Sequence, residues 1–111
     1  MLTPRLKPGI FARAVIRRAE VAGASAYVVK KGSEDAGTVL LKVSKLDGTA
    51  VVLSQARAGE GELVWMRPLG EVTDDEKASA YFEKQLKFDP DIWIVEIEDR
   101  QGRAFVDEKI V

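Results

Sequence analysis

Apolar and polar residues follow a helical period near the start of the chain. Phe11, Val15 and the neighbouring alanines recur every three or four positions, which places them on one face of a helix. Pro8 suits the first helical turn, and Gly23 suits the position just after the last turn. The pattern predicts a helix over residues 7–22.

After this helix the period shortens to two, the spacing of a β-strand with one buried face. Four segments show it: residues 25–31, 38–46, 49–56 and 62–67. In the second segment Val39, Leu41 and Val43 fall on one face. Asp47-Gly48 favours a two-residue turn with both residues at positive φ, so the second and third strands are expected to be antiparallel neighbours.

A second helix is predicted from Thr73 to about Lys87. Thr73 and Glu76 fit a capping box, in which each side chain bonds the backbone amide of the other residue. Pro90 ends the helix, because the residue before a proline disfavours helical geometry.

Residues 91–99 form the last predicted strand, with Trp93, Val95 and Ile97 on one face. The 111 residues are about the length of one domain. The order of elements predicts a single α+β domain over residues 1–111, built on an antiparallel sheet of about four to five strands. The N-terminal helix and the second helix, which precedes the last main strand, are expected to cover one face of that sheet.

The chain contains neither His nor Cys. This excludes Ser-His and Cys-His nucleophiles and zinc sites built from imidazole or thiolate. The carboxylates that could bind Mg²⁺ near the last strand are Asp91, Glu96, Glu98 and Asp99. A nuclease-like site also needs a lysine two positions after a strand carboxylate, and Glu98 stands in that position after Glu96. We therefore predict no catalytic residue, metal or cofactor, with a carboxylate-dependent metal enzyme as an alternative.

Charge is unevenly distributed, although the formal net charge is only −1. Residues 1–31 hold seven bases and one acid, so they carry +6 and the rest of the chain carries −7. The basic segment could bind a polyanion or an acidic partner. It could instead be neutralised inside the domain, with the head of Arg18 reaching a carboxylate of another element. The candidate binding residues are Arg13, Arg17, Arg18, Lys30 and Lys31.

A glycine-flanked loop occupies residues 32–37. It is not a phosphate loop of the Walker type, because Gly37 is followed by a strand rather than by Lys-Ser/Thr and a helix. We interpret it as a hairpin loop in which Gly32 and Gly37 take positive φ and Ser33 and Asp35 bond nearby amides. A binding loop formed by Lys30, Lys31, Ser33 and Asp35 is the alternative.

Trp65 and Trp93 lie on separate predicted strands, and we expect both at the edge of the core, each with a partner for its indole N–H. If they were exposed beside Arg100, they would form an interaction patch or a base-stacking platform.

The order of several short motifs resembles one known family. These motifs are Gly-x-x-Asp-Ala-Gly at 32–37, Asp47-Gly48, Leu-Ser-Gln-Ala-Arg at 53–57, Trp65, and Phe-Asp-Pro-Asp-Ile-Trp at 88–93. Over nearly its whole length the chain is similar to small alphaproteobacterial proteins catalogued as a domain of unknown function. The resemblance implies a bacterial cytoplasmic protein and brings no activity, cofactor or catalytic residue.

We expect a small non-enzymatic protein-interaction module located in the cytoplasm. The start of the chain lacks the apolar stretch of a secretory signal, and no apolar run approaches the ~20 residues of a membrane span. The partner is expected to be a protein. A nucleic-acid or polyanion binder that uses the basic N-terminal helix is the main alternative.

Overall fold

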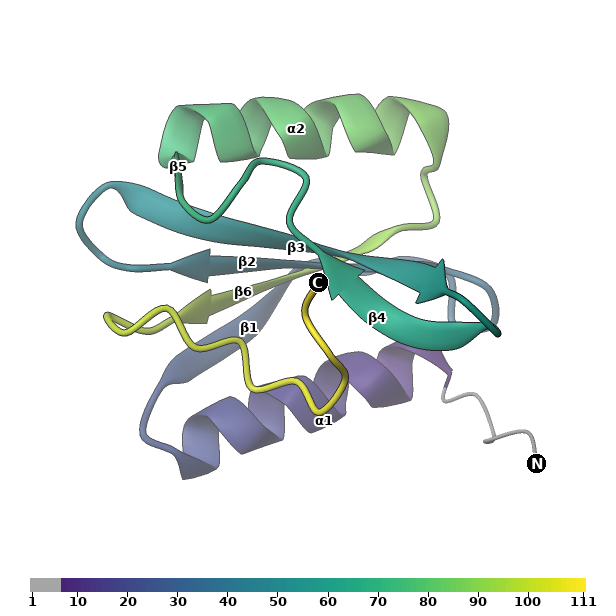
Figure 1. The fold of residues 1–111 in the computed structure, drawn as a ribbon, viewed down its shortest axis with the longest axis horizontal. Helices are drawn as coiled ribbons and strands as arrows, with labels where there is room; N and C mark the ends of the chain where they lie inside the picture. The colour runs from purple at the N-terminus through teal and green to yellow at the C-terminus, as the bar shows by residue number, and fades with distance from the viewer. Residues whose placement is uncertain (1–6) are drawn as a thin grey trace.

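The computed structural model of the protein describes residues 7–111. Two helices lie on opposite faces of one β-sheet, so the molecule has three layers (Figure 1). The elements in chain order are α1 (Pro8–Val21), β1 (Ser25–Lys30), β2 (Val39–Ser44), β3 (Thr49–Ala58), β4 (Glu62–Met66), β5 (Thr73–Asp74), α2 (Asp75–Phe88) and β6 (Trp93–Glu98). The predicted α+β class, with a second helix before the last main strand, is confirmed.

The six strands form a mixed sheet in the order β1-β6-β2-β3-β4, and the short β5 pairs with β3. β6 is antiparallel to β1 but parallel to β2. The expected antiparallel sheet of four to five strands is therefore corrected in strand count and in this one pairing. The reason is topological: the chain crosses the sheet through α2 and returns into its middle, between β1 and β2.

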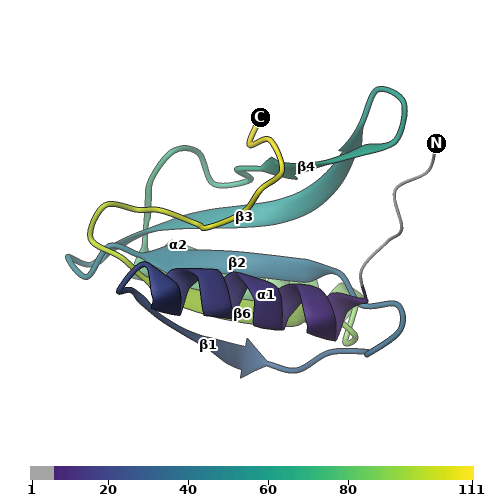
Figure 2. The same ribbon diagram turned by 90° about the horizontal axis from the view of Figure 1, so that it is seen from below.

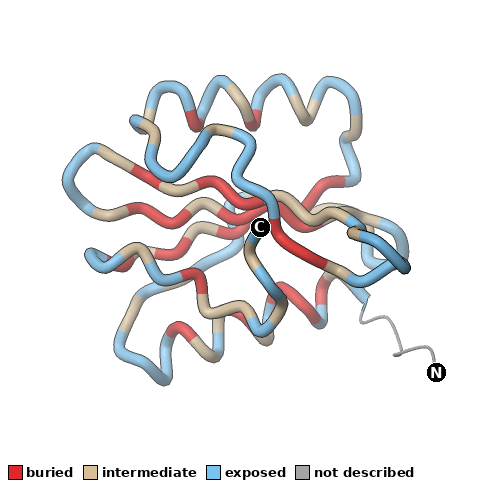
Figure 3. The backbone as a smooth tube through the Cα atoms, viewed as in Figure 1, coloured by how far each residue is buried: buried red, intermediate tan, exposed pale blue. Residues whose placement is uncertain are grey.

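Both faces of the sheet are apolar, and each is covered by its own helix. Val39, Leu41 and Val43 pack toward α1, together with the alternate residues of β6. Leu40 and Ile94 pack toward α2. The expectation that both helices cover one face is wrong, because the central strands bury side chains on both sides. Figure 3 shows these central strands as the most continuously buried part of the chain.

The first helix begins and ends within one residue of the predicted range 7–22. Pro8 is its first residue, and Gly23 follows it with φ of +89°. Gly23 N–H donates to Glu20 O, and Ala24 N–H to Ala19 O, which satisfies carbonyls at the helix end. Among the described residues, no helix combines the length and the apolar character needed to cross a membrane.

β2 and β3 are antiparallel neighbours, as the Asp47-Gly48 pair predicted. The turn itself differs, since Leu46 and Gly48 have positive φ, at 63° and 86°, while Asp47 does not. The Asp47 carboxylate instead accepts hydrogen bonds from the backbone and hydroxyl of Thr49. Asp47 therefore stabilises the turn through its side chain.

The N-terminal cap of α2 is Asp74, not Thr73. The Asp74 carboxylate accepts a hydrogen bond of 2.8 Å from the amide of Lys77. Thr73 is held in β5, where it pairs with Ala50 of β3. This strand pairing places the helix start one residue later than the capping-box pattern predicted.

Candidate functional site

The segment between β1 and β2 crosses the start of β6 at one end of the sheet. It must do so because β6 lies between these two strands. Ser33 N–H donates to Asp91 O at 2.9 Å, and Trp93 N–H donates to Thr38 O at 2.8 Å. We call loop residues 31–38 together with segment 88–93 the motif end, since two of the motifs found in the sequence meet here.

Gly32 and Gly37 are required by close packing, and the prediction that they take positive φ is wrong. A Cβ atom on either residue would collide with the carbonyl oxygen of Asp91. On Gly37 it would also press against the Trp93 ring. The loop is therefore a crossover packed directly on the backbone just before β6, at Asp91 and Ile92, and not a hairpin loop.

Trp93 is buried beneath this loop, and its indole Nε1–H donates to Ser33 O at 2.7 Å. The Ser33 hydroxyl oxygen accepts from the amides of Asp35 and Ala36, at 3.3 Å each. Ser33 thus bonds nearby amides as predicted, whereas the Asp35 carboxylate pairs with Lys7 at 3.4 Å. The loop is closed by its own contacts, which argues against a ligand-cradling role.

The two lysines before the loop hold it in place. Lys30 Nζ donates to Pro90 O at 2.8 Å and to Lys31 O at 3.1 Å. Lys31 Nζ lies 3.4 Å from Glu34 Oε1. Both cations are therefore engaged at the motif end rather than available as free members of a basic patch.

The motif end exposes one large apolar side chain among charged residues. Phe88, the last residue of α2, has 78% of its surface exposed. Pro90 and Asp91, which follow it, are exposed as well. Val29, next to the lysine that bonds Pro90 O, is 54% exposed. Sequence analysis missed Phe88, because periodicity marks the buried face of α2, with Ala78 and Phe82, and Phe88 lies off that face.

The three arginine candidates of α1 do not act together. Arg18 Nε donates to Phe105 O at 2.8 Å, and its Nη1 lies 3.2 Å from Asp107 Oδ2. The predicted reach of Arg18 to a carboxylate of another element is thus confirmed. Arg13 and Arg17 are exposed and make no ion pair with any described residue. Of the five basic candidates, Arg18, Lys30 and Lys31 thus have partners within the domain.

Trp65 is buried against Phe11, and it binds the C-terminal segment 100–111, here called the tail. Its Nε1–H donates to Glu108 Oε1 at 3.1 Å. Arg100 is exposed in the turn that starts the tail. Because both indoles are buried, the alternative of an exposed tryptophan patch beside Arg100 is wrong.

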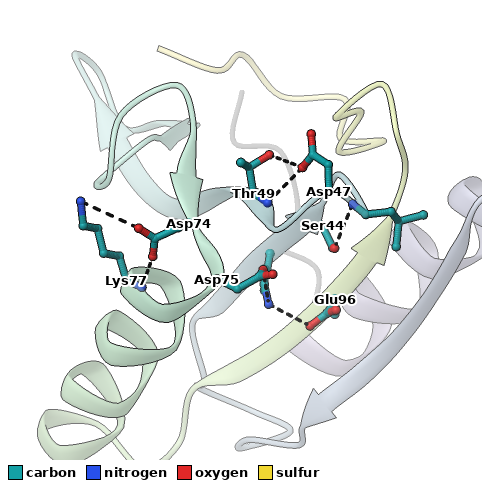
Figure 4. A network of polar contacts seen from close by, with 9 residues as sticks. Ser44, Asp47, Thr49, Asp74, Asp75, Lys77 and Glu96 are labelled. Atoms are coloured by element: carbon teal, nitrogen blue, oxygen red, sulfur yellow. Dashed lines mark hydrogen bonds and ion pairs between the residues drawn. The ribbon is translucent and has the colours of Figure 1, made fainter.

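Two of the four acids considered for Mg²⁺, Glu96 and Asp99, pair with different cations, while Glu98 lies at the end of β6 opposite Ser25. Glu96 lies 3.7 Å from the ammonium of the half-buried Lys42. The same ammonium lies 3.2 Å from Asp75 Oδ1, without hydrogen-bond geometry (Figure 4). Asp99 binds Arg103, and Asp91 stands at the motif end. Within residues 7–111, no three acidic side chains gather as ligands of one ion would.

The pKa values of two tyrosines and one aspartate depart from their usual range. Burial raises the pKa of Tyr27, and Glu96 beside it acts in the same direction. Burial also raises the pKa of Tyr81, which lies on α2. The hydrogen-bonded guanidinium of Arg103 holds the pKa of Asp99 below its usual range. None of these groups lies at the motif end, so the tyrosines and Asp99 do not suggest acid–base chemistry there.

Comparison with known proteins finds one matching family and several similar solved structures. The family model described as protein of unknown function, DUF1491, matches residues 6–107. No curated protein matches the chain.

Three solved structures are similar over nearly the whole chain. The crystal structure of a DUF1491 family protein from Caulobacter crescentus CB15 is 46% identical, with a TM-score of 0.89, and covers 96% of this chain and 100% of its own. The NMR structure of a DUF1491 family protein from the same organism is 45% identical, with a TM-score of 0.86, and covers 98% of this chain and 99% of its own. The solution structure of protein Atu0922 from A. tumefaciens is 30% identical, with a TM-score of 0.80, and covers 95% of this chain and 95% of its own. These relatives are alphaproteobacterial, which confirms the resemblance found in the sequence.

Proposed function

The chain belongs to the DUF1491 family, and from this membership and the geometry of the motif end we propose that it is a small protein-interaction module that binds a protein partner there. The exposure of Phe88 carries the proposal. A large apolar side chain on a rigid surface is a typical anchor for a partner, because burying it on binding removes apolar area from water.

The support for Phe88 is rigid on both sides. On one side α2 ends at Phe88, and the amide of Asp89 donates to Gln85 O at 3.0 Å. On the other side the Asp91 amide donates to the Asp89 carboxylate at 3.0 Å, and Pro90 O accepts from Lys30. A surface that is already ordered loses little conformational entropy when it binds. The backbone that carries Phe88 is therefore held from both sides.

Capture from an extract of the native cells tests this proposal. The protein is immobilised as wild type, as Phe88→Ala and as Val72→Ala, and the bound proteins are quantified by mass spectrometry. Val72 is a matched control, because it is 49% exposed and precedes β5, at the other end of α2. We expect a partner that is lost with Phe88→Ala and retained with Val72→Ala, while all three proteins melt alike. A partner set unchanged by Phe88→Ala would contradict the proposal.

Nucleic-acid binding is the weaker proposal. Arg18, Lys30 and Lys31 are held by groups of the same domain, so of the five candidates Arg13 and Arg17 are the two without an ion-pair partner among residues 7–111. Two exposed arginines give a small electrostatic contribution that salt screens. Filter binding at about 0.15 M salt, the physiological ionic strength, is expected to show negligible affinity for DNA and RNA. Submicromolar binding lost in Arg13→Glu/Arg17→Glu would favour this alternative instead.

A further inference from the structure

We propose that two copies of the chain associate through β1. In this arrangement β1 of each copy pairs antiparallel with β1 of the other about a two-fold axis, and the two α1 helices pack side by side on one face of the joined sheet. The proposal concerns the sheet edge and does not depend on the function assigned to the motif end.

The two outer strands of the sheet differ in their free edges. The outer edge of β4 is covered by the tail, because Trp65 N–H donates to Lys109 O and Val111 N–H donates to Trp65 O, each at 2.8 Å. β1 pairs with β6 alone among the described residues. Its outer backbone groups are therefore available to another strand, and an open edge of this kind is a template for pairing.

The side chains of β1 suit burial rather than solvent. Tyr27, Val28 and Val29 are 45%, 39% and 54% exposed. The strand holds no charged residue before Lys30, so it lacks the charge that usually protects a sheet edge. The register with β6 is regular from Ser25 to Val28 and shifts only after Val28. Four residues are thus ready for a regular antiparallel pairing.

The position of α1 allows the helices to meet when the strands pair. Figure 2 shows α1 running along the sheet beside β6, with β1 at the outer edge, and α1 contacts both strands. Because α1 contacts both β1 and β6, its axis lies above the gap between these strands. The two-fold axis would lie half a strand spacing outside β1, so two spacings of about 4.8 Å would separate the axes of the two α1 helices, roughly 10 Å in all. That separation is at the upper end of ordinary helix packing, about 8–10 Å. Val28, on the α1 face opposite Val95, would lie between them.

Charges on α1 are complementary under the same symmetry. Arg18 faces the tail, so the flank of α1 on the other side of its buried stripe faces β1. At 100° per residue Arg13 and Glu20 lie on that flank, two turns apart and too distant to pair within one copy. In an antiparallel helix pair Arg13 of one copy meets Glu20 of the other, and this contact occurs twice.

The β1 pair and the α1 pair are compatible with the same two-fold axis. The midpoint of Arg13 and Glu20 lies about 7 Å along the helix from Val21, at 1.5 Å per residue. Tyr27 lies about 7 Å along the strand from Ser25, at 3.3 Å per residue. Because α1 and β1 run in opposite directions from the tight turn at 22–24, one axis near Tyr27 serves both pairings.

Sedimentation equilibrium with charge-swap variants tests the dimer. We expect the wild type to dimerise and Val28→Glu to be monomeric, while Met66→Glu, an added acid on an exposed position of β4, changes nothing. Arg13→Glu and Glu20→Arg each place like charges together and should raise the dimer Kd about tenfold or more. The double variant Arg13→Glu/Glu20→Arg restores both pairs and should return the Kd to within about threefold of the wild type.

Two results would overturn the proposal. One is a wild type that stays monomeric up to about 1 mM, beyond which association is very weak. The other is a double variant that dimerises no better than either single variant, which would show that Arg13 and Glu20 do not meet. Melting curves of all variants establish that each is folded at the concentrations used.

Discussion

The two buried tryptophans each fasten a crossing segment, but with different chemistry. Trp93 donates its indole N–H to a backbone carbonyl of the loop, Ser33 O. Trp65 donates its indole N–H to a carboxylate of the tail, that of Glu108. The loop is thus held mainly by bonds to backbone carbonyls and by close packing, whereas the tail adds ion pairs of charged side chains to two backbone hydrogen bonds with Trp65.

Further contacts extend this difference. In the loop, Gly32 and Gly37 bring the backbone against the segment just before β6, with no space for a Cβ atom. Along the tail, Arg18 pairs with Asp107, and Arg103 donates to Asp99 through its amide and its guanidinium. Backbone carbonyls do not titrate, whereas carboxylates do. The loop is therefore expected to stay attached under acidic conditions that loosen the tail.

The largest expected effects come from removing either indole. Trp93→Ala and Trp65→Ala should each lower the free energy of unfolding by about 3–5 kcal/mol, because each leaves a large cavity in the core. The two variants should differ in which segment loses its protection from hydrogen exchange. Hydrogen exchange should rise first at residues 31–38 in Trp93→Ala and at 100–111 in Trp65→Ala. An even rise in both segments for both variants would show that the two attachments are not separate.

A smaller effect is expected from one methyl group in the loop. Gly32→Ala forces its Cβ into the carbonyl of Asp91 and should destabilise the protein by about 1–3 kcal/mol. Ala36→Ser, at an exposed position of the same loop, is the control and should change stability by less than about 0.5 kcal/mol. Urea denaturation measures both. Equal midpoints for Gly32→Ala and the wild type would mean that the loop can move away from β6.

The smallest effect is a dependence on pH that belongs to the tail. The bound Arg103 lowers the pKa of Asp99 in the folded state. The resulting stabilisation is complete above the unfolded pKa, about 3.9, and is lost as the pH falls through the lower folded pKa. The difference in urea midpoint between the wild type and Asp99→Asn should thus be largest near pH 6 and shrink below about pH 4.

Glu71→Gln, an exposed change with no partner among the described residues, serves as the control and should show no such narrowing. The contradicting outcome is a difference in urea midpoint between the wild type and Asp99→Asn that stays constant down to about pH 2.5, roughly 1.4 units below the unfolded pKa. It would indicate that the shape of Asp99 stabilises the fold and that its charge does not.

Features that depend on near neighbours could be predicted from the sequence. The helix at Pro8–Val21, the strand pair joined by Asp47-Gly48, and the division of β6 side chains between two faces all follow from short-range periodicity and turn chemistry. The reach of Arg18 toward a carboxylate also followed, because its position on the helical wheel is set by the helix alone. Membership of the family was indicated by the order of motifs.

Features that depend on distant segments could not. Nothing in the local pattern of residues 91–99 says that this strand enters between β1 and β2, more than 45 residues away along the chain. Once it does, the loop must cross it, so the glycines at 32 and 37 serve close approach instead of positive φ. The motif end and the exposed Phe88 arise only from that crossing.

The sequence by itself determined the element types, most of their bounds, the apolar stripe of each and the lack of His and Cys chemistry. These depend on backbone preferences and periodicity, which act over a few residues. The tertiary structure alone decided the parallel β2–β6 pair, the placement of the helices on opposite faces and the partners of Lys30, Trp65 and Trp93. The physical reason is that contacts between distant segments are selected by the packing of the whole core, to which every element contributes at once.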